Sequence, residues 1–346
     1  MNLNLWQMLV LALLQGVTEL FPISSLGHTV ILPGLLGWGD LVRNQQFLPL
    51  IVALHLGTSI ALVVYFWRDW YQVGRTLVVS IKQGEIRTGT QEWVGWLIII
   101  GCIPAGLLGV SLETTLKQLF ATPLVAASFL VVNGCILFVG EVLRRRAERR
   151  GTQAVSAPIE RPDASPAQSR WKWEYVPVEQ QDTRPFASPM LSPAHGERSV
   201  LTATASHTVP QPRAVQARPL ASLSWKEALL VGLAQSAALI PGISRSGVTM
   251  VASLGVGLSH ADAARYSFLL GTPLIGAAAL LEVPQLVGLP ASTLGLVLLG
   301  MGVAGVAAFL STKWLLKYFE TGRLHPFAYY CWGAGLLSLL FFLTVR

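Results

Sequence analysis

Two apolar stretches of this chain are interrupted by polar side chains whose types could handle a phosphate group. The interruptions centre on PISSLGH (Pro22 to His28) and PGISRSG (Pro241 to Gly247). Serine and glycine at helix starts expose backbone N–H groups to an anion, and an arginine among hydroxyls offers a planar, permanently charged fork for phosphate oxygens. We therefore predict that both motifs meet in one anion-handling site. Its polar residues would be Gln15, Glu19, Ser24, Ser25 and His28 from the first stretch and Gln235, Ser244, Arg245, Ser246 and Thr249 from the second.

Gln15 and Glu19 are four residues apart, so they share one face if this segment is helical. Two side-chain oxygens on one face could hold a divalent cation, which prefers oxygen ligands. The structural alternative is that Glu19 is neutral, or that it pairs with Arg245 merely to tie the two stretches together. A simple tie needs no row of hydroxyls, and this favours the phosphate-handling interpretation.

Two histidines leave alternatives open. His28 could donate or accept a proton near neutral pH, or it could cap the start of a helix. His55, in the run HLGTS, could line the same cavity or bond a neighbouring carbonyl, and the second reading is slightly favoured.

The composition indicates that a lipid bilayer surrounds most of the chain. Hydrophobic residues make up 52% and charged residues 12% of the 346 positions, whereas soluble chains carry about 25% charged residues. The formal net charge of +7 would suit a nucleic-acid partner, but the basic residues avoid the apolar runs and follow membrane topology, so we expect no nucleic acid. Polar residues at membrane depth are costly and are therefore functional candidates.

Six segments are long and apolar enough to cross a bilayer, which takes about 20 residues. The two interrupted stretches are too long for one helix, and their halves are too short to cross separately. Their freed backbone groups need protein or a watery cavity as partner, so we predict a re-entrant helical hairpin for each rather than two ordinary spans. Gly101, Gly106 and Gly109 are expected to allow close helix packing. The spans are 47–67, 93–112, 121–142, 267–287, 293–316 and 326–345, and the hairpins are 5–36 and 225–258.

The predicted fold class is an all-α polytopic membrane protein with an inverted repeat. Residues 1–142 form the first repeat and 225–346 the second, each a re-entrant helical hairpin followed by three transmembrane helices. Because three is odd, the second repeat enters from the opposite face, as in many transporters. Residues 143–224 form a linker in which few aliphatic residues stand among many Pro, Ser, Gln and Arg, a composition that predicts disorder.

Basic residues gather on one side of this topology: in 68–92, at the start of the linker and around 317–323. The positive-inside rule makes that side cytoplasmic. The linker would then be cytoplasmic, and both termini and the mouth of the first hairpin would face outward.

In their order along the chain, these motifs resemble the undecaprenyl-diphosphate phosphatases, also called bacitracin-resistance proteins. The hallmarks Q-G-x-T-E-x-x-P-x-S-S-x-G-H and P-G-x-S-R-S-G-x-T match Gln15 to His28 and Pro241 to Thr249. The runs LGTSIALVVYFW, GCIPAGLLG and ARYSFLLGTPLIGAAAL also look like family segments. The resemblance covers nearly everything except 151–224.

The resemblance implies an enzyme that removes the terminal phosphate of undecaprenyl diphosphate, which recycles the carrier lipid for peptidoglycan synthesis and confers bacitracin resistance. It also implies a divalent cation, Mg²⁺ or Ca²⁺, at Glu19 and Gln15. The attacking group would be Ser25, activated by His28 or Glu19, or a water on the metal; Ser25 is favoured. The implied catalytic residues are Glu19, Ser25, His28 and Arg245, and the implied substrate-binding residues are Ser24, Gly27, Ser244, Ser246, Gly247 and Thr249.

Three positions depart from the family pattern. Gln15 stands where a second Glu is common, Leu26 where a small polar residue is frequent, and His55 where Gln is usual. The alternative function is a polyprenyl-phosphate flippase, since inverted repeats with broken helices are transporter features. We expect the polyprenyl diphosphate and the lipids of the plasma (inner) membrane as partners, with a homodimer as a further candidate.

Overall fold

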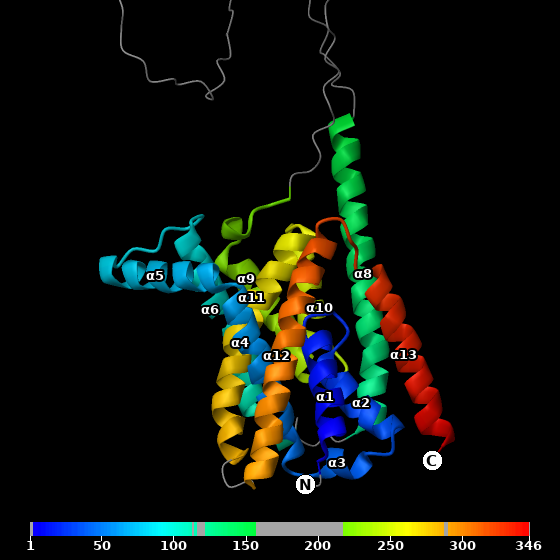
Figure 1. Cartoon of the computed structure of the whole chain (residues 1–346). Helices are drawn as coiled ribbons and strands as arrows, with labels where there is room; N and C mark the ends of the chain where they lie inside the picture. Colours follow the sequence, from blue (N-terminus) through cyan, green and yellow to red (C-terminus); the bar gives the residue numbers. More distant parts are fainter. Residues whose placement is uncertain (1–2, 113, 116–121, 157–216, 287–289, 346) are drawn as a thin grey trace, which may run out of the picture. The chain divides into compact units, whose positions relative to one another are not determined.

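The computed structural model describes residues 3–112, 114–115, 122–156, 217–286 and 290–345, and helices joined by short turns make up most of this part of the chain (Figure 1). No β-strand occurs among these residues, so the predicted all-α class is confirmed. The α-helices are α1 (Leu5–Thr18), α2 (Ser25–Leu35), α3 (Gly39–Arg43), α4 (Phe47–Tyr65), α5 (Trp67–Gln83), α6 (Gln91–Ser111), α8 (Pro123–Ser156), α9 (Trp225–Ser236), α10 (Arg245–Gly255), α11 (His260–Glu282), α12 (Ala291–Phe319) and α13 (His325–Thr344). Short 3₁₀ segments are η1 (Leu220–Ser222), η2 (Ala237–Leu239) and η3 (Val283–Leu286).

By length and composition, 6 helices could each cross a bilayer: α4, α6, α8, α11, α12 and α13. They correspond to the six predicted spans. Many of their side chains that face away from the protein are large and apolar, such as Leu107, Leu280 and Leu337. Such surfaces are stable in the hydrocarbon of a bilayer. The length and composition of these helices therefore confirm the prediction of a polytopic membrane protein.

Helix α8 continues well past the end of its predicted span, to Ser156. The residues after Val142 are good helix formers, and two pairs with helical spacing support the helix: Arg145 Nε lies 3.4 Å from Glu141 Oε1, and Arg144 Nε lies 3.1 Å from Glu148 Oε1. Most of the predicted linker, 157–216, lies outside the described residues.

Each interrupted stretch consists of two short helices. In the first, α1 and α2 are joined by residues 19–24; in the second, α9 leads through η2 and a turn into α10. These α-helices have 14, 11, 12 and 11 residues, which is short of the roughly 20 needed to cross a bilayer. The halves of both stretches are therefore too short to be independent spans, as predicted.

Small residues let the short helices pack closely against longer ones. A Cβ on Gly16 of α1 would lie 2.4 Å from the carbonyl oxygen of Ala304 on α12. A Cβ on Gly232 of α9 would lie 2.3 Å from the carbonyl oxygen of Gly101 on α6. Close backbone approach of this kind is what glycine permits in membrane helices, and the packing role expected for Gly101 is confirmed.

Arg218 anchors the start of the second stretch. Its guanidinium donates to Glu227 Oε1 at 2.7 Å and to the carbonyl oxygen of Val256 at 3.0 Å. Glu227 also completes a capping box with Ser224 at the start of α9. The hydrogen bond from Arg218 lowers the pKa of Glu227 to about 2, so this carboxylate is charged across the physiological range.

The Glu141 carboxylate fixes the position of α8. It is fully buried and is contacted at 2.8 Å by His260 Nε2, at 3.2 Å by Arg323 Nη1 and at 3.3 Å by the Leu324 backbone N–H. These partners belong to the start of α11 and to the turn between α12 and α13. Removing a partner from a buried charge is costly, so the contacts hold these three elements in one arrangement.

Helix α5 was not predicted. It follows α4 directly and lies crosswise to the spanning helices (Figure 1). Its charged residues include Arg68, Arg75 and Lys82, so it has no uninterrupted apolar run. Its apolar residues instead repeat with helical spacing, the signature of an amphipathic helix.

Candidate functional site

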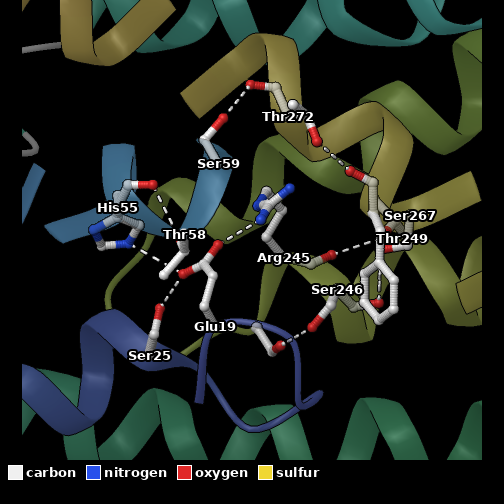
Figure 2. Close-up of polar contacts among 12 residues, drawn as sticks. Glu19, Ser25, His55, Thr58, Ser59, Arg245, Ser246, Thr249, Ser267 and Thr272 are labelled. Atoms are coloured by element: carbon white, nitrogen blue, oxygen red, sulfur yellow. Dashed lines mark hydrogen bonds and ion pairs between the residues drawn. The ribbon is translucent and has the colours of Figure 1, made fainter. Parts of the chain in front are cut away.

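The two interrupted stretches meet at the carboxylate of Glu19, which lies between Ser25, His55 and Arg245 (Figure 2). Oε2 accepts from Ser25 Oγ at 2.6 Å and from Gln15 Nε2 at 3.0 Å, and His55 Nε2 lies 3.1 Å away. Arg245 Nη2 donates to Oε1. A buried carboxylate needs such partners, and here they come from α1, α2, α4 and α10.

Local structure explains how these side chains reach one another. Gln15 and Glu19 stand one turn apart on the same helix face, as predicted. Ser25 and Arg245 are the first residues of α2 and α10. Each follows a serine that caps its helix: Gly27 N donates to Ser24 Oγ at 3.2 Å, and Gly247 N donates to Ser244 Oγ at 3.1 Å.

The backbone of Ser24 is unusual. Its φ of 69° is the one positive value at a non-glycine residue in the described part of the chain. Such a conformation is unfavourable outside glycine and persists where the surroundings impose it, often at functional sites. Ser24 stands immediately before Ser25, so this turn aims the Ser25 hydroxyl at Glu19.

Backbone carbonyls of the first turn bind the second stretch. Ser246 Oγ donates to the Phe21 carbonyl oxygen at 3.1 Å, and Ser244 Oγ does so at 3.4 Å. Asn133 of α8 completes the link: its Nδ2 donates to the Pro22 carbonyl oxygen at 2.9 Å, and its Oδ1 accepts from Ser244 N at 2.9 Å. The two turns are thus one hydrogen-bonded unit.

Thr249 and Gly271 position Arg245. Thr249 Oγ1 donates to the Arg245 carbonyl oxygen at 2.7 Å and also contacts Ser267 Oγ on α11. The Arg245 guanidinium lies against Gly271 of α11, where an added Cβ would be 1.1 Å from Nη1. The space beside Gly271 therefore sets where the charge lies.

His28 faces away from this centre. Its Nδ1 lies 2.7 Å from the Ser24 carbonyl oxygen and its Nε2 lies 2.9 Å from Tyr330 Oη, with the two rings stacked. His55 lies beside Glu19, and its Nδ1 also contacts the Ile51 carbonyl oxygen at 2.8 Å. Both readings of His55 thus hold: it lines the site and it bonds a neighbouring carbonyl.

Two buried polar atoms at the centre have no hydrogen-bond partner among the described residues: Arg245 Nη1 and Gln15 Oε1. Unpaired buried groups are costly, so each is suited to a ligand. Nη1 would donate to an anion's oxygen. Gln15 Oε1 would accept, or would be an oxygen ligand for a cation.

The divalent cation expected at Glu19 and Gln15 fits this centre only with help from other ligands. No group of three or more His, Cys, Asp or Glu side chains suited to a metal occurs in the described part of the chain. The two predicted ligands offer Gln15 Oε1 and the carboxylate of Glu19, and the Ser25 hydroxyl oxygen lies 2.6 Å from that carboxylate. Mg²⁺ is often held by one or two protein oxygens together with substrate phosphates and waters.

An apolar groove of about 320 Å³ opens beside His55. Gly106 and Gly109 line it. A Cβ on Gly106 would meet nothing within 4 Å, and a Cβ on Gly109 would meet only Leu239 Cδ2 at 3.8 Å, an ordinary contact distance. Neither position needs a glycine for close helix packing, so for these two residues the expected packing role is wrong. Side chains of α2, α4, α6, η2 and α11 form the walls, and Glu282 lies at the end of α11. Lining residues include Leu26, Val52, Leu239, Leu274 and Ala278.

Sequence reasoning named Glu19, Ser25, Gln15 and Arg245, which the structure brings together, but it did not name Asn133, Gly271 or Tyr330. Asn133 had a detectable signal, because it is a lone amide inside the apolar run VVNGC. Gly271 and Tyr330 had none, since their contacts form only in three dimensions.

The fold and this geometry define a multi-pass helical membrane protein in which two broken helical stretches share a buried carboxylate–guanidinium centre. A family model described as "Bacitracin resistance protein BacA" matches residues 8–160 and 198–337. The chain is 44% identical to undecaprenyl-diphosphatase 2 of Frankia alni, over 96% of both chains. It is 40% identical to undecaprenyl-diphosphatase of Mycobacterium avium, over 98% of this chain and 97% of the relative, and 36% identical to that of Acidiphilium cryptum, over 95% of both.

The chain therefore belongs to the family of bacitracin resistance proteins. The match covers both interrupted stretches and the six apolar helices except for residues 5–7 of α1 and 338–344 of α13.

Replacing Asn133 with leucine should destabilise the protein, because the Pro22 carbonyl and the Ser244 N–H would be left buried without partners. Each such group costs about 1–3 kcal/mol, and the midpoint of thermal unfolding in detergent should fall clearly. Ser128→Ala, on the same helix, is the matched control, since this hydroxyl donates to Leu124 within α8. An Asn133→Leu variant that unfolds at the control's temperature would contradict the bridging role.

Proposed function

We propose that this protein hydrolyses undecaprenyl diphosphate to undecaprenyl phosphate and inorganic phosphate, which returns the carrier lipid to peptidoglycan synthesis and confers bacitracin resistance. The names of the relatives support this substrate. The observation that carries the chemistry is the convergence of Ser25 and Arg245 on the two oxygens of Glu19. This arrangement places a hydroxyl, a base and a cationic donor at one point.

Ser25 is the proposed nucleophile. Glu19 Oε2 is 2.6 Å from its hydroxyl and can take the proton as Oγ attacks the terminal phosphorus. The bond between that phosphorus and the bridging oxygen breaks, and undecaprenyl phosphate leaves. Water then attacks the phosphoserine, which releases inorganic phosphate and restores the Ser25 hydroxyl. Direct attack by water is the alternative route.

Arg245 holds the diphosphate. One of its terminal nitrogens is bound to Glu19, and the other, Nη1, is buried without a partner and can donate to a phosphate oxygen. Donors that are already aimed at developing negative charge are a main source of catalysis in phosphoryl transfer. The other predicted substrate-binding residues would act indirectly. The start of α10, where Arg245 stands, would be held by Ser244, Ser246, Gly247 and Thr249. The start of α2 would be held by Ser24 and Gly27.

His28 has a positioning role in this scheme. Its ring contacts the Ser24 carbonyl and Tyr330, which supports the strained turn that presents Ser25. His55, which touches Glu19 Oε2 directly, orients the carboxylate toward the Ser25 hydroxyl.

A divalent cation, Mg²⁺ or Ca²⁺, is also part of the proposal. Gln15 Oε1 and Glu19 would hold it, with substrate phosphate oxygens and waters as the other ligands. When bound, it would supply positive charge to the phosphate oxygens. The unpaired, buried Gln15 Oε1 supports this assignment.

The groove beside His55 would receive the first isoprene units of the lipid. Its walls are almost wholly aliphatic, and His55, which contacts Glu19, is one of its lining residues. An apolar groove next to a charged centre matches a substrate with a hydrocarbon tail and a diphosphate head.

We further propose that α1–α2 and α9–α10 are re-entrant hairpins of an inverted repeat in the plasma (inner) membrane. Their short helices and the contact between their turns support this. The basic residues of α5, the end of α8 and the turn after α12 would face the cytoplasm, and both termini and the mouth of the first hairpin would face outward.

Purified protein should release inorganic phosphate from undecaprenyl diphosphate, and a chelator should stop the release.

Arg245→Ala should lower kcat/KM at least about 100-fold, because a charge-stabilising donor is lost. Ser25→Ala should be inactive, and a phosphoserine should be trapped at Ser25 by acid quenching. Failure to release phosphate from any prenyl diphosphate would overturn the proposal and favour lipid transport, whereas full activity of Ser25→Ala would eliminate that nucleophile alone.

Gly271→Ala should impair phosphate release while leaving the fold intact. The new methyl group would occupy the place of the Arg245 guanidinium, which is the flexible end of its side chain and must move away. We expect kcat/KM to fall about 100-fold, as for loss of the arginine. Gly276→Ala on the same helix is the control, since a Cβ there meets nothing within 4 Å. Equal activity of the two variants would show that the space beside Gly271 does not position the Arg245 guanidinium.

A further inference from the structure

We propose that α5 is a membrane-surface helix that binds the anionic phospholipid headgroups of the leaflet on its side through Arg68, Arg75 and Lys82. Helix α5 connects two spanning helices, exposes two rows of side chains and packs its remaining face on α6. This role of α5 is independent of the enzymatic proposal.

The connectivity places α5 at a membrane surface. It joins the end of α4 to the start of α6, two helices that each can cross the bilayer, so the connection lies at one face. Its 17 residues span about 25 Å at 1.5 Å per residue, short of the roughly 30 Å hydrocarbon core. Four charged residues, Arg68, Asp69, Arg75 and Lys82, also bar it from crossing.

One row of α5 is apolar and not covered by protein. Trp67, Tyr71, Val78 and Ile81 fall on one face by helical spacing, and their exposed fractions run from 52% at Val78 to 68% at Ile81. The opposite side packs on α6: Trp96 Nε1 donates to Ser80 Oγ at 3.2 Å. The exposed row is therefore available to a partner outside the described part of the chain.

The row beside it is basic. Arg68, Arg75 and Lys82 are seven residues apart, so they form one line along the helix, next to the apolar row. All three are exposed, and none forms an ion pair with a described residue. The acidic residue of α5, Asp69, is paired with Arg265 of α11 and faces away from this line.

An anionic leaflet fits both rows better than a protein does. An apolar face flanked by Lys and Arg, with Trp and Tyr at its start, is the pattern of helices that lie in the headgroup region. Each basic residue near an anionic surface is attracted to it, and salt weakens this attraction by screening the charges. A protein partner would need acidic groups spaced along this line, and it would have to enter a region that lipid headgroups already fill.

Hydrogen exchange of α5 amides tests the proposal. The full-length protein would be placed in nanodiscs of phosphatidylcholine alone or mixed with phosphatidylglycerol. In the anionic discs exchange across 67–83 should slow about tenfold or more, given the attraction expected for three basic residues, and high salt should reverse most of the difference.

Two variants make the test specific. Arg68→Gln/Arg75→Gln/Lys82→Gln should lose the lipid-dependent difference, whereas Arg68→Lys/Arg75→Lys/Lys82→Arg, which keeps the charge, should retain it. Both should unfold in detergent at the wild-type temperature, because these side chains are exposed. Equal exchange in the two kinds of wild-type disc would overturn the proposal. A difference that survives in the glutamine variant would do the same, as would protection that depends on two protein copies per disc.

Discussion

A carboxylate removed from water is stable only when donors surround it, and the Glu19 carboxylate is buried where four helices meet. Gln15 comes from the same helix, Ser25 from the next, His55 from the first spanning helix and Arg245 from the far half of the chain. Each of these donors must lie within hydrogen-bond distance of the carboxylate. The turns, helix caps and close packing around Glu19 keep the donors in these positions. Arg245 Nη1 has no hydrogen-bond partner among the described residues, so it can still donate to a bound ligand.

Helix α8 acts as the frame for this centre. Its Asn133 joins the two turns, and about two helical turns further along its Glu141 binds the start of α11 and the turn before α13. Helix α11 in turn carries Gly271, against which the Arg245 guanidinium lies. The position of the charged group thus depends on backbone contacts well outside the motifs that contain it, which is the usual way in which a site is held rigid.

Sequence reasoning reached the parts of this centre that local rules govern. Gln15 and Glu19, four residues apart, and the hydroxyl residues around Arg245 could be recognised because they are polar residues inside apolar stretches expected to lie in the membrane. The orientation of His28 was not predictable, because it is set by Tyr330, whose distance along the chain hides the contact. Helix α5 has no uninterrupted apolar run, which is the usual sign of a membrane segment. Its signal lies in the helical periodicity of its apolar residues.

We propose that Glu19 and Arg245 join both broken stretches into a single catalytic unit. A double-mutant cycle on kcat/KM for phosphate release, with Glu19→Gln, Arg245→Gln and the combined variant, tests it most directly. We expect strong non-additivity, with the combined variant about as slow as the worse single variant and a coupling free energy of about 2 kcal/mol or more. Losses that simply multiply would show that the two residues act separately and would contradict it.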